Sequence, residues 1–167
     1  MSGTPPVRDA VPADFDAIVR LNRESEHFLS RMDLARLLVL RSQAAALRVA
    51  DNGGAVAAFL LAFAPGCAYD SENYRWFDAR FERFIYVDRV VVDAAQRGRG
   101  LGALLYEDVF ALARQGGFER VVCEFDVEPP NPVSAKFHAR FGFREVGSQQ
   151  VSYARKRVSL QEALLAR

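Results

Sequence analysis

The sequence has few of the residues that mark metal sites and disulfide frameworks. It contains two cysteines, Cys67 and Cys123, and two histidines, His27 and His138, among 167 residues. The cysteines are isolated and lack metal-ligand spacing, and two histidines are too few for a histidine-rich metal site. We therefore expect no metal cofactor. Two thiols without a disulfide pattern favour a reducing, cytoplasmic location.

The chain also lacks an excess of charge and a long apolar run. Its formal net charge is +1, which indicates neither a nucleic-acid surface nor an anionic-membrane surface. No apolar run approaches the roughly 20 residues that a membrane helix needs. The first residues, Met-Ser-Gly-Thr-Pro-Pro, lack the charged and then apolar pattern of a signal peptide. We expect no nucleic-acid partner and no membrane association.

The composition that remains is that of a globular domain. Half of the residues are hydrophobic and 26% are charged, and this length is enough for one domain with a core but short for two. We expect a single domain over residues 1–167, with residues 1–5 and 160–167 as loose tails.

Apolar periodicity and turn residues predict a mixed α/β fold, in which helices flank a central mixed sheet. The expected order is a strand, two helices, three strands, a helix, a strand, a helix and two strands. Strands are expected at 6–10, 47–51, 55–64, 84–93, 119–127, 143–146 and 150–158, and helices at 15–26, 31–40, 101–115 and 131–141. Residues 65–80 are expected to form a polar loop that carries aromatic side chains.

A glycine-rich loop joins the strand at 84–93 to the helix at 101–115. Glycines at alternate positions leave backbone N–H groups uncovered, and the helix start adds N–H groups and a partial positive charge, so this loop suits an anion such as a pyrophosphate. A P-loop would need Lys and then Ser or Thr, but Ala103 and Leu104 follow Gly102. The spacing of Gly98, Gly100 and Gly102 also differs from the dinucleotide fingerprint. An ordinary tight turn remains the structural alternative.

The pattern Arg-x-x-Gly-x-Gly, formed by Arg97, Gly100 and Gly102, resembles the coenzyme A loop of the GNAT N-acetyltransferases. Further on, the motif Asn131-x-x-Ser134-x-x-x-His138-x-x-x-Gly142-Phe143 resembles the GNAT pattern Asn-x-x-Ala-x-x-x-Tyr-x-x-x-Gly-Phe. The strings Y-V-D-R-V-V-V and P-P-N-P-x-S-x-x-F-H resemble a bacterial subgroup of predicted GNAT acetyltransferases. This resemblance implies no particular substrate.

The resemblance implies the GNAT acyltransferase fold and acetyl-CoA as cosubstrate. The strand before the loop would separate from its neighbour, and its backbone at Val90, Val91 and Val92 would hold the pantetheine arm and the thioester carbonyl. Other residues would bind the coenzyme at its pyrophosphate or from the following helix: Arg97, Gly98, Arg99, Gly100, Leu101, Gly102, Ala103, Asn131, Ser134 and His138.

His138 stands where the family usually has the tyrosine that protonates the departing thiolate. A tyrosine with a pKa near 10 can donate a proton at neutral pH. A histidine with a pKa near 6.5 is mostly uncharged at pH 7.5. His138 is therefore a candidate acid, a candidate base for the amine, or a hydrogen-bond partner of the coenzyme.

Acetyl transfer requires an unprotonated amine, so we searched for a carboxylate base near Val90. Asp88 lies two residues before Val90 on the same strand face, and an acid there is out of place unless it pairs with Arg89, with a loop arginine or with a substrate amine. Glu124 and Asp126 lie on the next strand. Each of these acids is also compatible with a structural ion pair or a solvent-facing position, and ordered water could carry the proton instead.

The acceptor is expected to be a small-molecule or peptide amine. Asn22, on an otherwise apolar helix stripe, either contacts this acceptor or bonds a neighbouring loop. Tyr74 and Trp76, in the aromatic loop, either line the acceptor site or cover the core. A homodimer through the C-terminal strands is an option in this family. A domain that binds acyl-CoA without transferring the acyl group is the alternative function.

Overall fold

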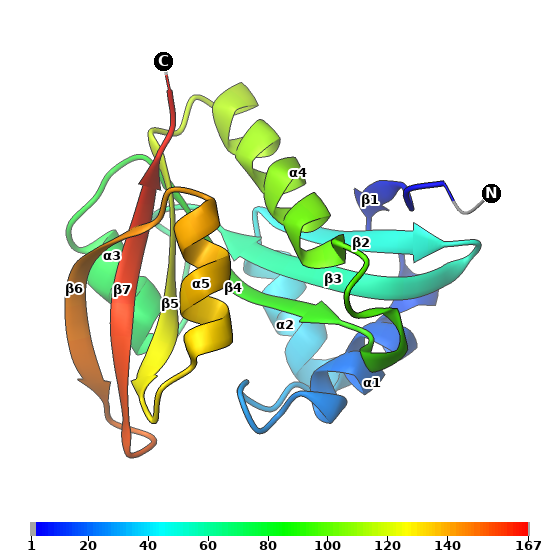
Figure 1. Cartoon of the computed structure of the whole chain (residues 1–167), viewed down its shortest axis with the longest axis horizontal. Helices are drawn as coiled ribbons and strands as arrows, with labels where there is room; N and C mark the ends of the chain where they lie inside the picture. Colours follow the sequence, from blue (N-terminus) through cyan, green and yellow to red (C-terminus); the bar gives the residue numbers. More distant parts are fainter. Residues whose placement is uncertain (1–2, 167) are drawn as a thin grey trace. The chain divides into compact units, whose positions relative to one another are not determined.

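A computed structural model describes residues 3–166, and Figure 1 shows the order of its elements. Two 3-10 turns, at Pro12–Asp14 and Ala94–Gln96, precede α1 and α4. The helices are α1 (Phe15–Glu24), α2 (Leu34–Gln43), α3 (Glu72–Asp78), α4 (Leu101–Gln115) and α5 (Pro132–Arg140). The strands are β1 (Val7–Asp9), β2 (Ala46–Asn52), β3 (Ala55–Phe63), β4 (Phe84–Val92), β5 (Arg120–Glu128), β6 (Arg144–Val151) and β7 (Lys156–Leu164).

The chain forms two compact units. The first comprises the residues up to Phe63 together with 89–111, and the second comprises 64–88 together with the residues from 112 onward. Both β4 and α4 run through the two units. The single domain that we expected from the length therefore stays a prediction.

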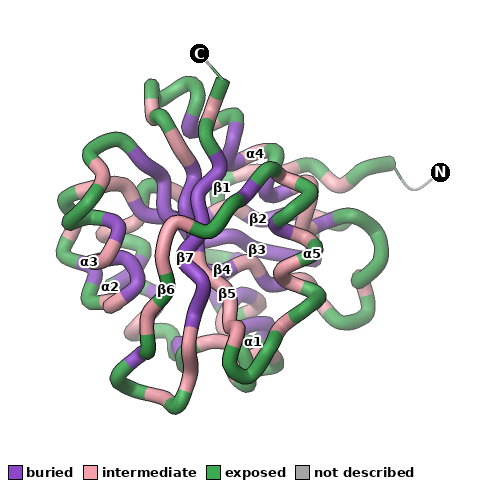
Figure 2. Tube along the Cα trace, turned by 60° about the vertical axis from the view of Figure 1, so that its left-hand side comes forward, coloured by how far each residue is buried: buried purple, intermediate pink, exposed green. Residues whose placement is uncertain are grey.

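In the first unit, β1 pairs antiparallel with β2, and β2 pairs antiparallel with β3. Asn52 ends β2, and Gly53 and Gly54 form the turn with φ angles of 66° and 90°, which explains why glycine is needed at both positions. From Val56 to Phe63 every residue of β3 is buried, as Figure 2 shows along this strand. Such a run is typical of a strand covered on both faces.

In the second unit, the first part of β4 pairs parallel with β5, β5 pairs antiparallel with β7, and β7 pairs antiparallel with β6. The pairings of the two units give a seven-stranded mixed sheet in the order β1-β2-β3-β4-β5-β7-β6. This arrangement, flanked by helices, confirms the predicted fold class.

The ladder between β4 and β5 is short. It joins Phe84 to Arg120, Ile85 to Val121 and Tyr86 to Val122, and the described residues continue it no further. If the same register continued, Val87 would lie opposite Cys123 and Asp88 opposite Glu124. The two strands therefore stop pairing just before a carboxylate on each of them.

Three sequence-based expectations were wrong. The segment 65–80 is not only a loop, because Ser71 caps the seven-residue helix α3 by accepting a hydrogen bond from the Tyr74 N–H at 3.2 Å. Residues 160–164 are not a loose tail but the end of β7, where residues 160–163 are buried against β5. The turn of the last hairpin lies at 152–155, inside the strand predicted at 150–158. The proposed tail residues 1, 2 and 167 lie outside the described residues.

A close contact fixes α3 against β6 within the second unit. A Cβ atom built on Gly147 would lie 2.5 Å from Cζ2 of Trp76, so no larger residue fits without a shift. Gly147 also follows the irregularity of the β6–β7 ladder after Glu145. The Trp76 ring in turn packs edge-on against Phe77 and carries the Arg80 guanidinium at 4.0 Å. None of the helices within residues 3–166 is long and apolar enough to cross a membrane.

Candidate functional site

The glycine-rich loop lies in the first unit and leads directly into α4. Gly98 and Gly100 have φ angles of +78° and +75°, a conformation that residues with side chains rarely adopt. A Cβ atom built on either glycine would meet no other atom within 4 Å, so the backbone faces open space. The loop therefore has both the conformation and the room that a phosphate group requires.

The start of α4 provides the donors. The helix begins at Leu101, and the Leu104 N–H makes a helical hydrogen bond to the Gly100 carbonyl at 3.0 Å. The N–H groups of Leu101, Gly102 and Ala103 are those that a helix leaves without an intrahelical acceptor. Arg97 and Arg99 are exposed beside them, and Arg99 donates to the Gln96 side chain at 2.9 Å. This combination suits a pyrophosphate.

The predicted pantetheine strand is the second part of β4. Val91 is buried, whereas Val90 and Val92 are half-buried. These residues follow the point at which the β4–β5 ladder ends. A strand edge that has left its neighbour offers backbone N–H and C=O groups to a ligand.

The two candidate acids occupy the positions just past that ladder, in the second unit. The Tyr86 hydroxyl donates to Oε1 of Glu124 at 2.9 Å, and the Tyr69 hydroxyl donates to Oδ1 of Asp88. The Tyr69 and Tyr86 rings lie 6.4 Å apart. Two tyrosine–carboxylate pairs therefore lie side by side.

The Glu124 carboxyl is strongly perturbed. Burial and then the Asp88 carboxylate raise its pKa to about 8, although hydrogen bonds from the Tyr86 and Asn73 side chains oppose the rise. A carboxyl that changes charge near neutral pH is suited to accept a proton from an amine.

His138 is nine-tenths buried, at 7% exposure, on α5. Its ring stacks on Phe125 with centroids 5.5 Å apart and meets Phe137 and Phe143 edge-on. Nδ1 lies 2.7 Å from the Ser134 carbonyl, a distance that identifies Nδ1 as the protonated nitrogen of the neutral ring. Burial lowers the pKa of His138, so the ring is neutral at pH 7. In this state Nε2 is an acceptor and has no proton to donate.

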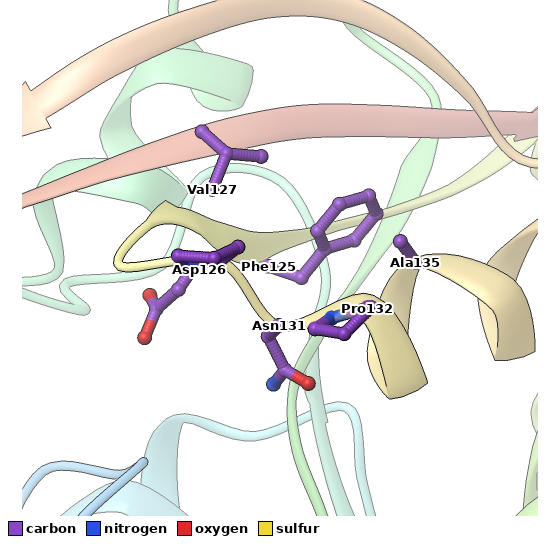
Figure 3. Close-up of a pocket in the computed structure, with 7 residues that line it drawn as sticks. Phe125, Asp126, Val127, Asn131, Pro132 and Ala135 are labelled. Atoms are coloured by element: carbon purple, nitrogen blue, oxygen red, sulfur yellow. The ribbon is translucent and has the colours of Figure 1, made fainter.

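A small pocket of about 110 Å³ lies between the end of β5 and the start of α5. In Figure 3 the Phe125 ring extends toward Ala135, while the Asp126 carboxylate and the Asn131 amide extend to another side. Asn131 caps α5 by accepting a hydrogen bond from the Ser134 N–H at 3.2 Å. Lys156 pairs with Asp126 at 3.0 Å. Asn131 and Asp126 thus have structural partners, and a role of Asn131 in coenzyme binding stays a prediction.

The three predicted acceptor residues have structural contacts as well. Asn22 is fully buried, donates to the Ser30 carbonyl at 3.2 Å and accepts from Arg89 at 2.9 Å. Tyr74 is 1% exposed, and its hydroxyl donates to the Ala64 carbonyl at 2.7 Å. Trp76 packs on Gly147. These contacts match the structural alternatives stated for each residue, and contact with an acceptor stays a prediction.

Sequence reasoning did not single out Tyr86, and it did not predict the contacts that Tyr69 and Arg89 make. Asp88 accepts a hydrogen bond from the Tyr69 hydroxyl, and Arg89 donates hydrogen bonds to Asn22 and Ser30. The tyrosine in the string Y-V-D could have signalled Tyr86, because Tyr86 and Asp88 share a strand face. No group of three or more His, Cys, Asp or Glu residues that could hold a metal ion occurs in the described chain.

Comparison with known proteins agrees with this geometry. Residues 15–143 match the model of the Acetyltransferase (GNAT) family. A phosphinothricin N-acetyltransferase of Streptomyces coelicolor is 41% identical over 59 residues, which are 35% of this chain and 33% of that protein. The matched stretch therefore spans about a third of that relative's length.

Solved structures share the fold over nearly the whole chain. Ard1 from Thermoplasma volcanium superposes with a TM-score of 0.80 at 16% identity, covering 99% of this chain and 100% of that one. A GNAT superfamily phosphinothricin acetyltransferase from Sinorhizobium meliloti, solved in complex with acetyl-CoA, has a TM-score of 0.71 at 20% identity. The similarity covers 98% of this chain and 89% of that one. Because the family model matches from α1 to Phe143, the residue before β6, the chain belongs to the GNAT acetyltransferase family.

Proposed function

We propose that this protein is an acetyl-CoA-dependent N-acetyltransferase that transfers the acetyl group directly from the thioester to a primary amine. The observation that carries the proposal is the open glycine loop at the start of α4. Gly98 and Gly100 combine positive φ angles with free space where a side chain would lie. Family membership makes coenzyme A the natural occupant of this loop.

The coenzyme would be bound mainly by backbone groups. The N–H groups at 98–103 would bind the pyrophosphate, and Arg97 would add a positive charge. The backbone at Val90, Val91 and Val92 would hold the pantetheine arm and direct an N–H group toward the thioester oxygen. Such a donor stabilises the oxyanion that develops when the carbonyl is attacked.

Glu124 would be the base, and Asp88 would raise its proton affinity. An alkylammonium with a pKa of about 10 has no lone pair, so the amine must first lose a proton. One ammonium proton passes to Glu124, and the nitrogen lone pair attacks the thioester carbon. The attacking nitrogen then loses its second proton to solvent, and the C–S bond breaks to release the thiolate. Asp88 supports the transfer because its negative charge raises the proton affinity of Glu124.

His138 would be a hydrogen-bond partner of the coenzyme rather than the acid for the thiolate. Its Nδ1 is committed to the Ser134 carbonyl, and its lowered pKa keeps the ring neutral. Nε2 would then accept a hydrogen bond from an amide N–H. Without an acid at this position, the thiolate would take its proton from solvent.

The test is calorimetric titration with acetyl-CoA, with ATP and NAD as controls, on the wild type and two matched variants. Gly100→Val places a side chain in the pyrophosphate space, and we expect at least a tenfold weaker dissociation constant, about 1.4 kcal/mol. Gly66→Val is the control, because Gly66 has a similar φ of +78° and an equally open Cβ position outside the loop.

Equal affinity in all three proteins would refute the loop assignment. Binding of acetyl-CoA without transfer to any of a broad set of amines would instead favour a non-catalytic acyl-CoA-binding domain. Release of free coenzyme A thiol that depends on an added amine would support the enzyme.

A further inference from the structure

We propose that Tyr86 and Asn73 hold the Glu124 carboxyl and favour its charged form, and that Gln149 acts on Glu124 through Asn73. The inference rests on the proposed function, in which Glu124 is the base, and adds three positioning residues to that site. It is carried by hydrogen bonds and by the register of the sheet within the second unit, which contains all four residues.

Tyr86 reaches Glu124 from the neighbouring strand. Its hydroxyl donates to Oε1 of Glu124 at 2.9 Å, and the whole residue is buried. Tyr86 lies opposite Val122, which is two residues before Glu124, so all three share one face of the sheet. The Tyr86 ring packs edge-on against Tyr74 of α3, with the centroids 5.6 Å apart. This packing fixes the direction of the hydroxyl.

Helix α3 covers the same face of the sheet. Glu124 and Gly147 both pair with Leu160, one from each side, so the two residues point to this face together. The Trp76 ring of α3 occupies the space beside Gly147, and α3 also contacts β5. The helix therefore spans the strands from β5 to β6.

Asn73 links Glu124 to the edge strand β6. Gln149, two residues after Gly147 and on the same face, donates from Nε2 to Oδ1 of Asn73 at 2.7 Å. This bond uses the amide oxygen of Asn73 and leaves its NH2 group to donate elsewhere. The buried Asn73 side chain donates a hydrogen bond to Glu124. Gln149 therefore determines which end of the Asn73 amide faces the carboxyl.

The two donors have the same effect on the base. A hydrogen bond to a carboxylate stabilises its charged form, and both bonds lower the pKa of Glu124 against the larger effect of burial. A base must be unprotonated before it can accept a proton. Tyr86 and Asn73 thus increase the fraction of Glu124 that is ready to act near neutral pH.

Other ionisable groups also act on this carboxyl. The Asp88 carboxylate raises the pKa of Glu124 more than any other charge does. The remaining groups on the elements around it include Asp126 on β5, Tyr69 before α3, Glu72 on α3, and Tyr153 and Lys156 next to β7. Variants of Tyr86, Asn73 and Gln149 leave all of these groups in place, so their charges are common to every protein compared.

The experiment measures the protonation of Glu124 in two independent ways. The first is a carbon-13 NMR titration of the Glu124 carboxyl, identified by its absence in Glu124→Gln, which needs neither coenzyme nor acceptor. The second is the pH profile of kcat/KM for thiol release from acetyl-CoA, with the most active amine of the set used to test the proposed function.

Removing either donor should raise the NMR titration midpoint of Glu124. In Tyr86→Phe and in Asn73→Leu we expect a rise from about 8 to about 9, and in Gln149→Leu about half of that rise. Gln150→Leu is the control, because Gln150 is exposed on the opposite face of β6. The double variant Asn73→Leu/Gln149→Leu should match Asn73→Leu alone, because Gln149 acts through Asn73.

An unchanged midpoint in Tyr86→Phe or in Gln149→Leu would overturn the role of that residue. Additive rises in the double variant would overturn the route through Asn73. Gln149→Leu alters only a half-buried side chain, so it tests this route even if Asn73→Leu fails to fold. A raised NMR midpoint with an unchanged kcat/KM profile would support the positioning residues and would remove Glu124 as the base of the proposed function.

Discussion

Replacing Glu124 with glutamine should remove a large part of the pH dependence of stability. The folded-state pKa of Glu124 is raised from the ordinary 4.5 to about 8, so the native state holds the proton more tightly than the unfolded chain. The corresponding stabilisation is fully present below about pH 4.5 and is lost as the pH rises through about 8. At about 1.4 kcal/mol for each pKa unit, the upper bound is about 5 kcal/mol.

Solvent screening lowers this stabilisation free energy, because Glu124 is half-buried rather than fully buried. We expect the wild type to lose about 3 kcal/mol relative to Glu124→Gln between about pH 5 and about pH 9. Urea unfolding of both proteins across this range measures the difference, and other titrating groups cancel in it. Glu107→Gln, an exposed change on α4, is the control and should follow the wild type. If the free energies of unfolding of the wild type and Glu124→Gln changed in parallel with pH, the raised pKa of Glu124 would be refuted.

Three further predictions concern the site and its support. Glu124→Gln should lower kcat/KM about 100-fold or more and abolish its rise near pH 8, since the base must lose its proton; a retained pH profile would point to another base. His138→Phe should weaken acetyl-CoA binding with little change in kcat, whereas a fall in kcat at unchanged affinity would restore the acid role. Gly147→Ala should cost about 2 kcal/mol in thermal or urea unfolding because its Cβ would meet Trp76, and unchanged stability would show that the ring moves freely.

The elements with strong local signals were predictable from the sequence. The loop with Gly98 and Gly100, the Asn52-Gly53 turn and the apolar run of β3 each carry their own pattern, and the structure has a loop, a turn and a buried strand there. These features depend on backbone conformation and on burial of one segment, which neighbouring residues largely determine.

The features that sequence reasoning missed depend on contacts between distant segments. Residues 160–164 were expected to be part of a loose tail, but they pair with β5, in which Leu164 faces Arg120. Asp88 was recognised as an unusual acid, but its partner Tyr69 is 19 residues away in a segment without periodicity. The perturbed pKa of Glu124 likewise arises from burial and from Asp88 across the sheet, neither of which a single strand reveals.

The contact between Trp76 and Gly147 has a consequence for how the sequence can diverge. The indole ring occupies the volume of a side chain at position 147, so the two positions share one space. In related sequences, any residue larger than glycine at position 147 should be accompanied by a smaller residue at position 76. Covariation of this pair would therefore reveal which relatives retain the packing of α3 on β6 and which have lost it.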